Sequence, residues 1–409
     1  MNDRRASIWL RSGYWWGSAA TASLIPYLAL HYRNLGFAGE RIGVLLAVLP
    51  LGAALLAPFW GVVADTFAAH RLILRCVLAA SAVCAMLLSR ADSFATVLLL
   101  LSLLSICAAP VPSLFDSYGV TLAERMGASY GTLRIWGSLG YIAAALVVGR
   151  WMGGVVSGVF FAAYAGCMAL ALLSSFGLPA LTLHTSRHAW RGVGRLLSQG
   201  SMLALLLTTF LAWSAMSIMY NFIGILVEER GGDTGIIGTA FALSATSELP
   251  VLAFSAWFFR RLGSSRMIAL ALALYSVRLL ILSLVPSAGW ILPVQLLHGL
   301  TYGLFLTASV TLAHQIAGQE LAATGQGLLS SMSAGFGMIT GSLVGGALLD
   351  DAGVTALFRL ASAMMFTALV VFLIGRRFLP AAATTPPLRA SANEEASAPS
   401  AAGAEERIA

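Results

Sequence analysis

The chain contains no lysine, and only 10% of its 409 residues are charged. Soluble domains carry about 25% charged residues, so this composition excludes an ordinary soluble globular protein. All 24 residues of the Lys and Arg class are arginine, a usage that we attribute to genome composition. These arginines are scattered at the ends of apolar segments, so the net charge of +7 does not indicate nucleic-acid binding.

The sequence also lacks the residue sets of an enzyme. Four cysteines lie in or beside apolar segments without metal-ligand spacing, and we interpret them as packing residues: Cys76, Cys84, Cys107 and Cys167. No nucleophile and base, and no set of metal ligands, occurs at a recognisable spacing. We therefore expect no enzymatic activity, no metal and no cofactor. We expect a proton gradient to drive the activity of the protein.

Long apolar runs dominate instead. The chain is 59% hydrophobic, and its apolar runs divide into roughly twelve segments long enough to cross a bilayer at about 20 residues each. The first run, 14–32, is too long for a signal peptide and has no convincing cleavage site. The sequence predicts an all-α polytopic membrane protein. Its parts are an N-terminal six-helix bundle (1–180), a cytoplasmic linker (181–197), a C-terminal six-helix bundle (198–378) and a disordered tail (379–409).

The arginines predict the orientation. With both termini inside, most arginines fall on the cytoplasmic side, which the positive-inside rule requires. These are Arg4, Arg5, Arg11, Arg71, Arg75, Arg125, Arg187, Arg191, Arg195, Arg260, Arg261, Arg266, Arg376 and Arg377. We expect a multi-pass protein of the bacterial inner membrane with cytoplasmic termini.

The two halves echo each other at one constant offset. Ile42-Gly43 corresponds to Ile237-Gly238, and Ser138–Tyr141 corresponds to Ser333–Phe336. Two parallel six-helix repeats are typical of alternating-access transporters, whose site lies near the midplane between them.

Five ionisable residues interrupt the apolar segments: Asp116, Arg134, Glu248, Arg278 and His298. A charge at bilayer depth costs about 2.5–3.5 kcal/mol even on lenient insertion scales, so it is normally paired, hydrated or functional. Asp116 and Arg134 flank one helix connection at similar depth. They form either a structural salt bridge or a pair that binds polar groups of a substrate.

Glu248, Arg278 and His298 fall on three successive apolar segments. Pro250 loosens the helix of Glu248 and is expected to expose carbonyls to a cavity. A glutamate that moves between an apolar environment and an arginine contact couples protonation to conformation. A single membrane histidine is often just a hydrogen-bonding group, but His298 has two ionisable neighbours.

The segment Gly61–Asp65 with Arg71 resembles the loop motif between the second and third helices of the major facilitator superfamily. The resemblance implies a cytoplasmic gating role for Gly61, Asp65 and Arg71. The copy departs from the pattern at Thr66 and at Ala69-His70, where basic residues are usual.

Within that superfamily the chain resembles the lactose permease-like proton symporters, and the phenylpropionate permeases in particular, over essentially its whole length before the tail. The most specific stretch is Tyr130–Gly140. The resemblance implies a substrate pair (Asp116, Arg134), a ring-stacking residue (Tyr141), and a proton-coupling set (Glu248, Arg278, His298).

Two departures bear on the coupling. Gln295 and Thr301 stand where lactose permease has a lysine and a glutamate, so that permease's main proton-carrying carboxylate is missing. The resemblance then leaves Glu248 as the expected proton carrier. Tyr27, Asn221 and Tyr302 are further candidates for the pocket lining, although such residues often serve packing instead.

The sequence thus predicts a secondary transporter that moves a small organic solute with a proton by alternating access. The solute is an aromatic acid such as phenylpropionate, a sugar or a nucleoside. The alternatives are proton-driven efflux of a drug or metabolite, and a transporter-like sensor that binds without translocating. We expect a monomer whose partners are its substrate, protons and lipid, and no nucleic acid.

Overall fold

The computed structural model describes residues 3–179 and 192–379, and no strand occurs among them. Nine segments of this part are long and apolar enough to cross a membrane. The last of the nine, Ala288–Phe378, spans 91 residues and reverses at Gly318 and Gly353. Their φ angles of 68° and 74° lie in the left-handed region that suits glycine. The all-α membrane architecture is therefore confirmed.

The elements follow one another in chain order. The first half contains α1 (Asp3–Leu24), η1 (Ile25–Tyr27), α2 (Leu28–Asn34), α3 (Gly39–Thr66), α4 (His70–Leu88), α5 (Phe94–Ala108), α6 (Val111–Met126), α7 (Tyr130–Trp151) and α8 (Val159–Phe176). The second half contains α9 (Val193–Leu197), α10 (Gly200–Glu229), α11 (Thr234–Ala253), α12 (Ser255–Leu284), η2 (Ala288–Trp290), α13 (Ile291–Gln295), η3 (Gly299–Gly303), α14 (Leu304–Ser330), η4 (Ser331–Gly337), α15 (Met338–Gly375) and η5 (Arg376–Phe378).

These elements give twelve crossings in the described part of the chain. The elements α1, η1 and α2 form one crossing, α5 and α6 form another, and the segment Ala288–Phe378 contains three. The count agrees with the prediction. Of the predicted linker, residues 193–197 form α9, whereas 181–191 and the tail after Leu379 lie outside the described residues.

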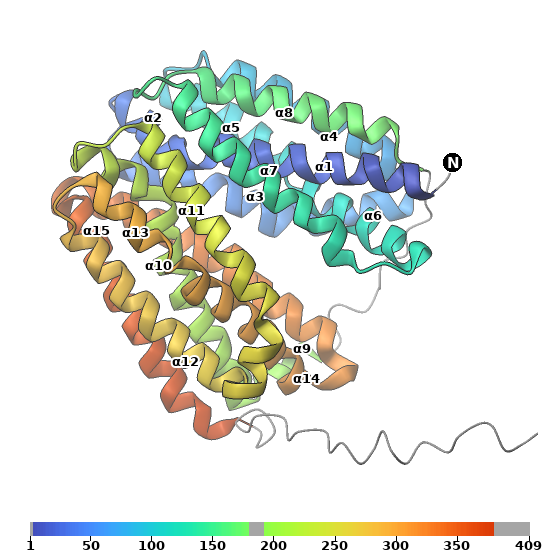
Figure 1. The fold of residues 1–409 in the computed structure, drawn as a ribbon, viewed down its shortest axis with the longest axis vertical. Helices are drawn as coiled ribbons and strands as arrows, with labels where there is room; N and C mark the ends of the chain where they lie inside the picture. Colours follow the sequence, from blue (N-terminus) through green and yellow to red (C-terminus); the bar gives the residue numbers. More distant parts are fainter. Residues whose placement is uncertain (1–2, 180–191, 380–409) are drawn as a thin grey trace, which may run out of the picture.

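The two halves meet at one end of the molecule, which we call the contact end, and diverge from it towards the N-terminus (Figure 1). Two seams join them, α3 against α15 and α7 against α11. A Cβ atom on Gly43 would lie 2.7 Å from the Ser342 carbonyl oxygen, and one on Gly238 would collide with the Ala145 carbonyl. The two glycines of the predicted repeat therefore serve the same purpose, because each lets the helices of opposite halves touch.

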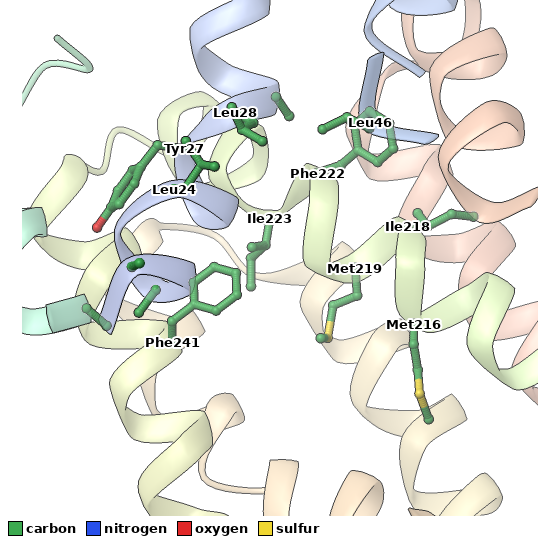
Figure 2. Close-up of a cluster of buried hydrophobic side chains, with 14 of the residues drawn as sticks. Leu24, Tyr27, Leu28, Leu46, Met216, Ile218, Met219, Phe222, Ile223 and Phe241 are labelled. Carbon is green, nitrogen blue, oxygen red and sulfur yellow. The ribbon is translucent and has the colours of Figure 1, made fainter. Parts of the chain in front are cut away.

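Polar and apolar contacts reinforce the contact end. Arg33 pairs with Glu229 at 2.9 Å, and the Gly39 N–H donates to Asp350 Oδ2 at 2.7 Å. Figure 2 shows Leu28 of α2 near the side chains of α10, among them Ile223. The halves are thus held together at the end that the predicted orientation places outside the cell.

The proposed gating motif lies at the opposite end. Asp65 Oδ1 lies 2.9 Å from His70 Nε2, so the histidine that replaces a usual basic residue still contacts the aspartate. Among residues 3–179 and 192–379, a Cβ atom on Gly61 would meet nothing within 4 Å. No helix of this part of the protein therefore packs closely on Gly61 in this conformation.

Candidate functional site

A cavity of about 420 Å³ lies between the two halves. The first half contributes Asp116 and Arg134, and the second half contributes Glu248 and His298. Four of the five predicted ionisable residues therefore share one cavity. Aromatic rings line it from both sides: Tyr14, Phe115, Tyr141, Tyr164, Tyr220, Phe241 and Tyr302.

Asp116 of α6 is fixed by two tyrosines from other helices. Tyr14 of α1 donates its hydroxyl to Asp116 Oδ1 at 2.9 Å, and Tyr130 of α7 donates to the same oxygen at 2.6 Å. Hydrogen bonds to a charged acceptor are short and strong, so this oxygen is already occupied. The second oxygen, Oδ2, is the one that faces Arg134.

Arg134 is only loosely paired with Asp116. Its Nη1 lies 3.9 Å from Asp116 Oδ2 and donates to the Tyr130 hydroxyl at 3.2 Å. The Arg134 side chain is 62% exposed, and that of Asp116 is 35% exposed. An exposed ion pair at this distance contributes little to the stability of a fold. This pair is open, so both partners have hydrogen-bonding capacity left for a solute.

A second polar network runs from the cavity into the other half. Glu248 Oε1 of α11 lies 2.9 Å from His298 Nε2, and Arg278 Nη1 of α12 lies 2.8 Å from His298 Nδ1. Glu248 is 25% exposed to the cavity, whereas His298 and Arg278 are buried. The three residues therefore form a chain from the cavity wall to a buried cation.

Chemistry fixes the form of His298 in this chain. A guanidinium has only donors, so His298 Nδ1 must accept from Arg278 and carries no proton. His298 is then the neutral tautomer with its hydrogen on Nε2, which donates towards Glu248. Nε2 also lies 2.9 Å from the Tyr220 hydroxyl. One N–H group thus has two acceptors within reach.

The residues that depart from lactose permease hold Arg278. Gln295 Oε1 accepts from Arg278 Nη2, and Thr301 Oγ1 accepts from Nη1 at 3.3 Å. Within residues 3–179 and 192–379, no carboxylate forms a salt bridge with Arg278. The cation is therefore stabilised by neutral acceptors and, through His298, by Glu248.

Close packing brings Glu248 to His298. A Cβ atom on Gly299 would collide with the Ser247 carbonyl, and the Gly299 N–H donates to Ser247 Oγ at 2.9 Å. The π-helical turn η3 begins at this glycine, and such turns often occur at functional sites. Only glycine lets the two backbones approach closely enough to join Glu248 with its neighbour.

The remaining predicted residues separate into two groups. Tyr141 lines the cavity, and Tyr302 lines it while stacking on His298 at 5.0 Å between ring centroids. Tyr27 and Asn221 are not among the lining residues. Tyr27 is buried with its hydroxyl at the seam glycines Gly149 and Gly238, beside the apolar cluster of Figure 2.

Asn221 also has a packing role. Its Nδ2 donates to Ser217 Oγ and, across to α15, to Ser342 Oγ at 2.9 Å.

Pro250 does not expose a carbonyl to the cavity as expected. The carbonyl that it frees is that of Thr246, and Thr246 is not a lining residue. No group of His, Cys, Asp and Glu residues within the described ranges is suited to hold a metal.

The sequence analysis missed the three tyrosines whose hydroxyls contact the ionisable residues of the site: Tyr14, Tyr130 and Tyr220. Tyr130 precedes Arg134 by four residues, a spacing that places both on one helix face and is visible in the sequence. Tyr14 and Tyr220 reach their partners across helices. No local pattern marks them.

Comparison with known proteins agrees with this geometry. The family model described as "MFS_1 like family" matches residues 7–360. The chain belongs to this family. A maltose permease of Geobacillus stearothermophilus is 26% identical and covers 87% of this chain and 91% of its own length. A probable 3-phenylpropionic acid transporter of Escherichia coli (strain K12) is 23% identical, over 71% of this chain and 77% of its own.

Two further proteins are similar to this chain. The multidrug resistance protein MdtG of Dickeya zeae is 27% identical over 92% of this chain and 97% of its own. The solved nucleoside transporter NupG (D323A mutant) superimposes with a TM-score of 0.83 at 16% identity, over 90% of this chain and 99% of that one. The protein is thus a multi-pass transporter of permease or efflux type and not an enzyme, and the predicted resemblance is confirmed.

Proposed function

We propose that this protein is a proton-coupled symporter that takes up a small organic solute across the bacterial inner membrane, with both termini cytoplasmic. The observation that carries the proposal is the chain from Glu248 through His298 to Arg278, which begins at the cavity and ends at a buried cation. With the predicted orientation, the conformation is inward-facing, because the halves touch at the outer end.

Glu248 acts as the proton carrier in this proposal. As a carboxylate it accepts from His298 Nε2–H and counterbalances the charge of Arg278. When Glu248 binds a proton, the counter-charge disappears and Glu248 becomes a weaker acceptor, so the His298 N–H interacts more with the Tyr220 hydroxyl, which lies 2.9 Å from Nε2. Proton binding therefore changes the bonds between α11 and its neighbours, which is what coupling to helix movement requires.

Solute binding is assigned to the other half. Asp116 Oδ2 and Arg134 offer an acceptor and a planar set of donors at the cavity surface. Tyr141 offers a ring face to an apolar side of the solute. Sugars, nucleosides and aromatic acids are the solute classes that the names of related transporters suggest.

The test is solute flux into right-side-out membrane vesicles while the external pH is recorded. Maltose, uridine and 3-phenylpropionate form the first panel. We expect substrate-dependent alkalinisation outside the vesicles, and its loss in Glu248→Gln with solute binding retained. Proton-coupled accumulation by Glu248→Gln at the wild-type level would remove Glu248 from this role.

Efflux is the second candidate, because MdtG is similar over nearly the whole chain. It uses the same fold and the same titratable groups in the opposite direction. Proton-driven accumulation in inside-out vesicles, with no uptake in right-side-out vesicles, would favour efflux. Binding without flux in either preparation would indicate a sensor.

A further inference from the structure

The fourth crossing is broken where two prolines stand close together. The helix α5 ends at Ala108, and α6 begins at Val111, with Pro110 before it and Pro112 within its first turn. Proline has no N–H, and each helical N–H bonds the carbonyl four residues earlier. Pro110 and Pro112 therefore leave the carbonyls of Ile106 and Ala108 without their helical donors.

The two freed carbonyls lie in different surroundings. The indole Nε1 of Trp60 in α3 donates to the Ile106 carbonyl at 3.0 Å, and Ile106 does not line the cavity. Across the described ranges 3–179 and 192–379, no backbone or side-chain donor bonds the Ala108 carbonyl. One orphan acceptor is thus satisfied by the protein, and the other is not.

Ala108 itself belongs to the cavity wall. Ala108, Pro112 and Asp116 all line the cavity, and their spacing of four residues places them on one face of the broken helix. The helical bond that is missing would run between Ala108 and Pro112, hence along this same face. The free acceptor lies about 12 Å along the helix from Asp116, at 1.5 Å per residue.

We propose that the Ala108 carbonyl is a hydrogen-bond acceptor of the transport site, and that the solute carries a hydroxyl or N–H group that donates to it. This inference rests on the proposed transport function. The first half then presents two acceptors in line, Ala108 O and Asp116 Oδ2, beside the donors of Arg134. A polyhydroxylated solute satisfies all three, whereas an ionised arylalkanoate has no donor for Ala108.

The test restores the missing donor. Pro112→Ala supplies an N–H that closes the helical bond to the Ala108 carbonyl and removes this acceptor from the cavity. For the hydroxylated solute that the wild type binds, maltose or uridine, we expect the dissociation constant to rise about fivefold. Pro110→Ala is the matched control. The N–H that it introduces is directed at the Ile106 carbonyl, which already accepts from Trp60, so this variant should bind the solute with the affinity of the wild type.

Pro112→Gly supplies the same N–H and replaces Pro112→Ala if that variant does not fold. Solute analogues add a second readout. A deoxy analogue that lacks the bonding hydroxyl should bind the wild type about fivefold more weakly than the parent solute does. The same analogue and the parent solute should bind Pro112→Ala with equal affinity. Equal affinities of Pro112→Ala and wild type would overturn the assignment. Equal weakening by Pro110→Ala, or binding of 3-phenylpropionate alone, would overturn it as well.

The proton readout separates the two proposals. A drop in affinity in Pro112→Ala without any alkalinisation by the wild type would support the acceptor and contradict proton coupling. Alkalinisation with unchanged affinity in Pro112→Ala would support coupling and contradict the acceptor.

Discussion

Asp116 illustrates how a single side chain can be both held and available. Two tyrosine hydroxyls donate to its Oδ1, while its Oδ2 faces a half-open gap to Arg134. The first oxygen fixes the rotamer, and the second is free to accept from a solute, as we propose. This division follows from three helices that converge on one carboxylate, and it is the arrangement that we expect of a binding pair.

Asp116→Asn therefore keeps the fold and weakens binding. The amide oxygen still accepts from Tyr14 and Tyr130, so the melting temperature in detergent should not change. Loss of the charge-assisted contact, worth about 1.5–3 kcal/mol, should raise the dissociation constant of the solute roughly tenfold or more. Tyr14→Phe keeps the charge of Asp116 and the Tyr130 hydrogen bond to Oδ1, so it should weaken binding less than Asp116→Asn does. An unfolded Asp116→Asn protein would instead identify a structural salt bridge.

Tyr220 is the residue that we expect to tune proton binding. A protonated Glu248 accepts more weakly than the carboxylate, so the His298 N–H then depends more on the Tyr220 hydroxyl, and losing a hydrogen bond of this kind costs about 0.5–1.5 kcal/mol. Tyr220→Phe therefore penalises the protonated state more than the ionised one, so the pH midpoint of transport should move lower, by up to about one unit. The measurement is uptake rate against external pH.

The control for this prediction is Tyr275→Phe. Tyr275 also packs against the His298 ring, but its hydroxyl donates to Met219 Sδ at 3.7 Å. The uptake rate of Tyr275→Phe should depend on external pH as that of the wild type does. A shift of the same size in both variants would show that general packing, rather than the Tyr220 hydroxyl, sets the midpoint.

At the scale of elements, α3 begins without a cap from its own half. Its N-cap residue, Ala38, has no side-chain acceptor, and the first-turn N–H of Gly39 donates to Asp350 of α15 in the other half. A carboxylate at a helix N-terminus also interacts favourably with the helix dipole. The cap exists only while the contact end is closed, so it favours this conformation.

Asp350→Ala should therefore populate the outward-open state. Loss of an N-cap costs about 1 kcal/mol, which corresponds to roughly fivefold in a two-state equilibrium. A cysteine at Ala145, buried at the α7–α11 seam, reports the opening in a protein whose native cysteines are serine. In Asp350→Ala, labelling of this cysteine by an impermeant maleimide should be about fivefold faster. Asp351→Ala removes the neighbouring carboxylate and serves as the control, in which the labelling rate should not change.

At the scale of the whole molecule, the two halves touch at one end (Figure 1), and the cavity lies between them. The five ionisable residues are divided between the halves, with the proposed solute pair in one and the proposed proton chain in the other. In the alternating access that we propose, the halves move relative to each other, so contacts at the contact end break in every cycle.

Linking the halves there should stop transport. Arg33 and Glu229 form an ion pair at 2.9 Å across the halves, so cysteines at these positions can be joined by a short cleavable bifunctional maleimide. Uptake should fall to background and return after cleavage. Cysteines at Arg41 and Phe94, which are in contact within the first half, form the control pair. Full uptake by the linked Arg33/Glu229 protein would contradict alternating access by this movement.

The sequence by itself determined the membrane architecture and the ionisable residues of the site. Apolar segments of about 20 residues fix helices in a bilayer, because every backbone group must be satisfied within the segment. A charge among them is so costly that Glu248, Arg278 and His298 are conspicuous without any structure. The repeat also indicated that Gly43 and Gly238 are equivalent, and both prove to be seam glycines.

Only the tertiary structure decided which residues meet. Tyr14 and Tyr220 reach Asp116 and His298 from helices far away in the sequence, and helix periodicity says nothing about such partners. Tyr27 and Asn221 have the same residue types yet serve packing, because side-chain direction depends on how the helices rotate against each other. The prolines make the same point. Ala108, whose carbonyl Pro112 frees, lines the cavity, whereas Thr246, whose carbonyl Pro250 frees, does not, because the packing of the bundle sets which helix face meets the cavity.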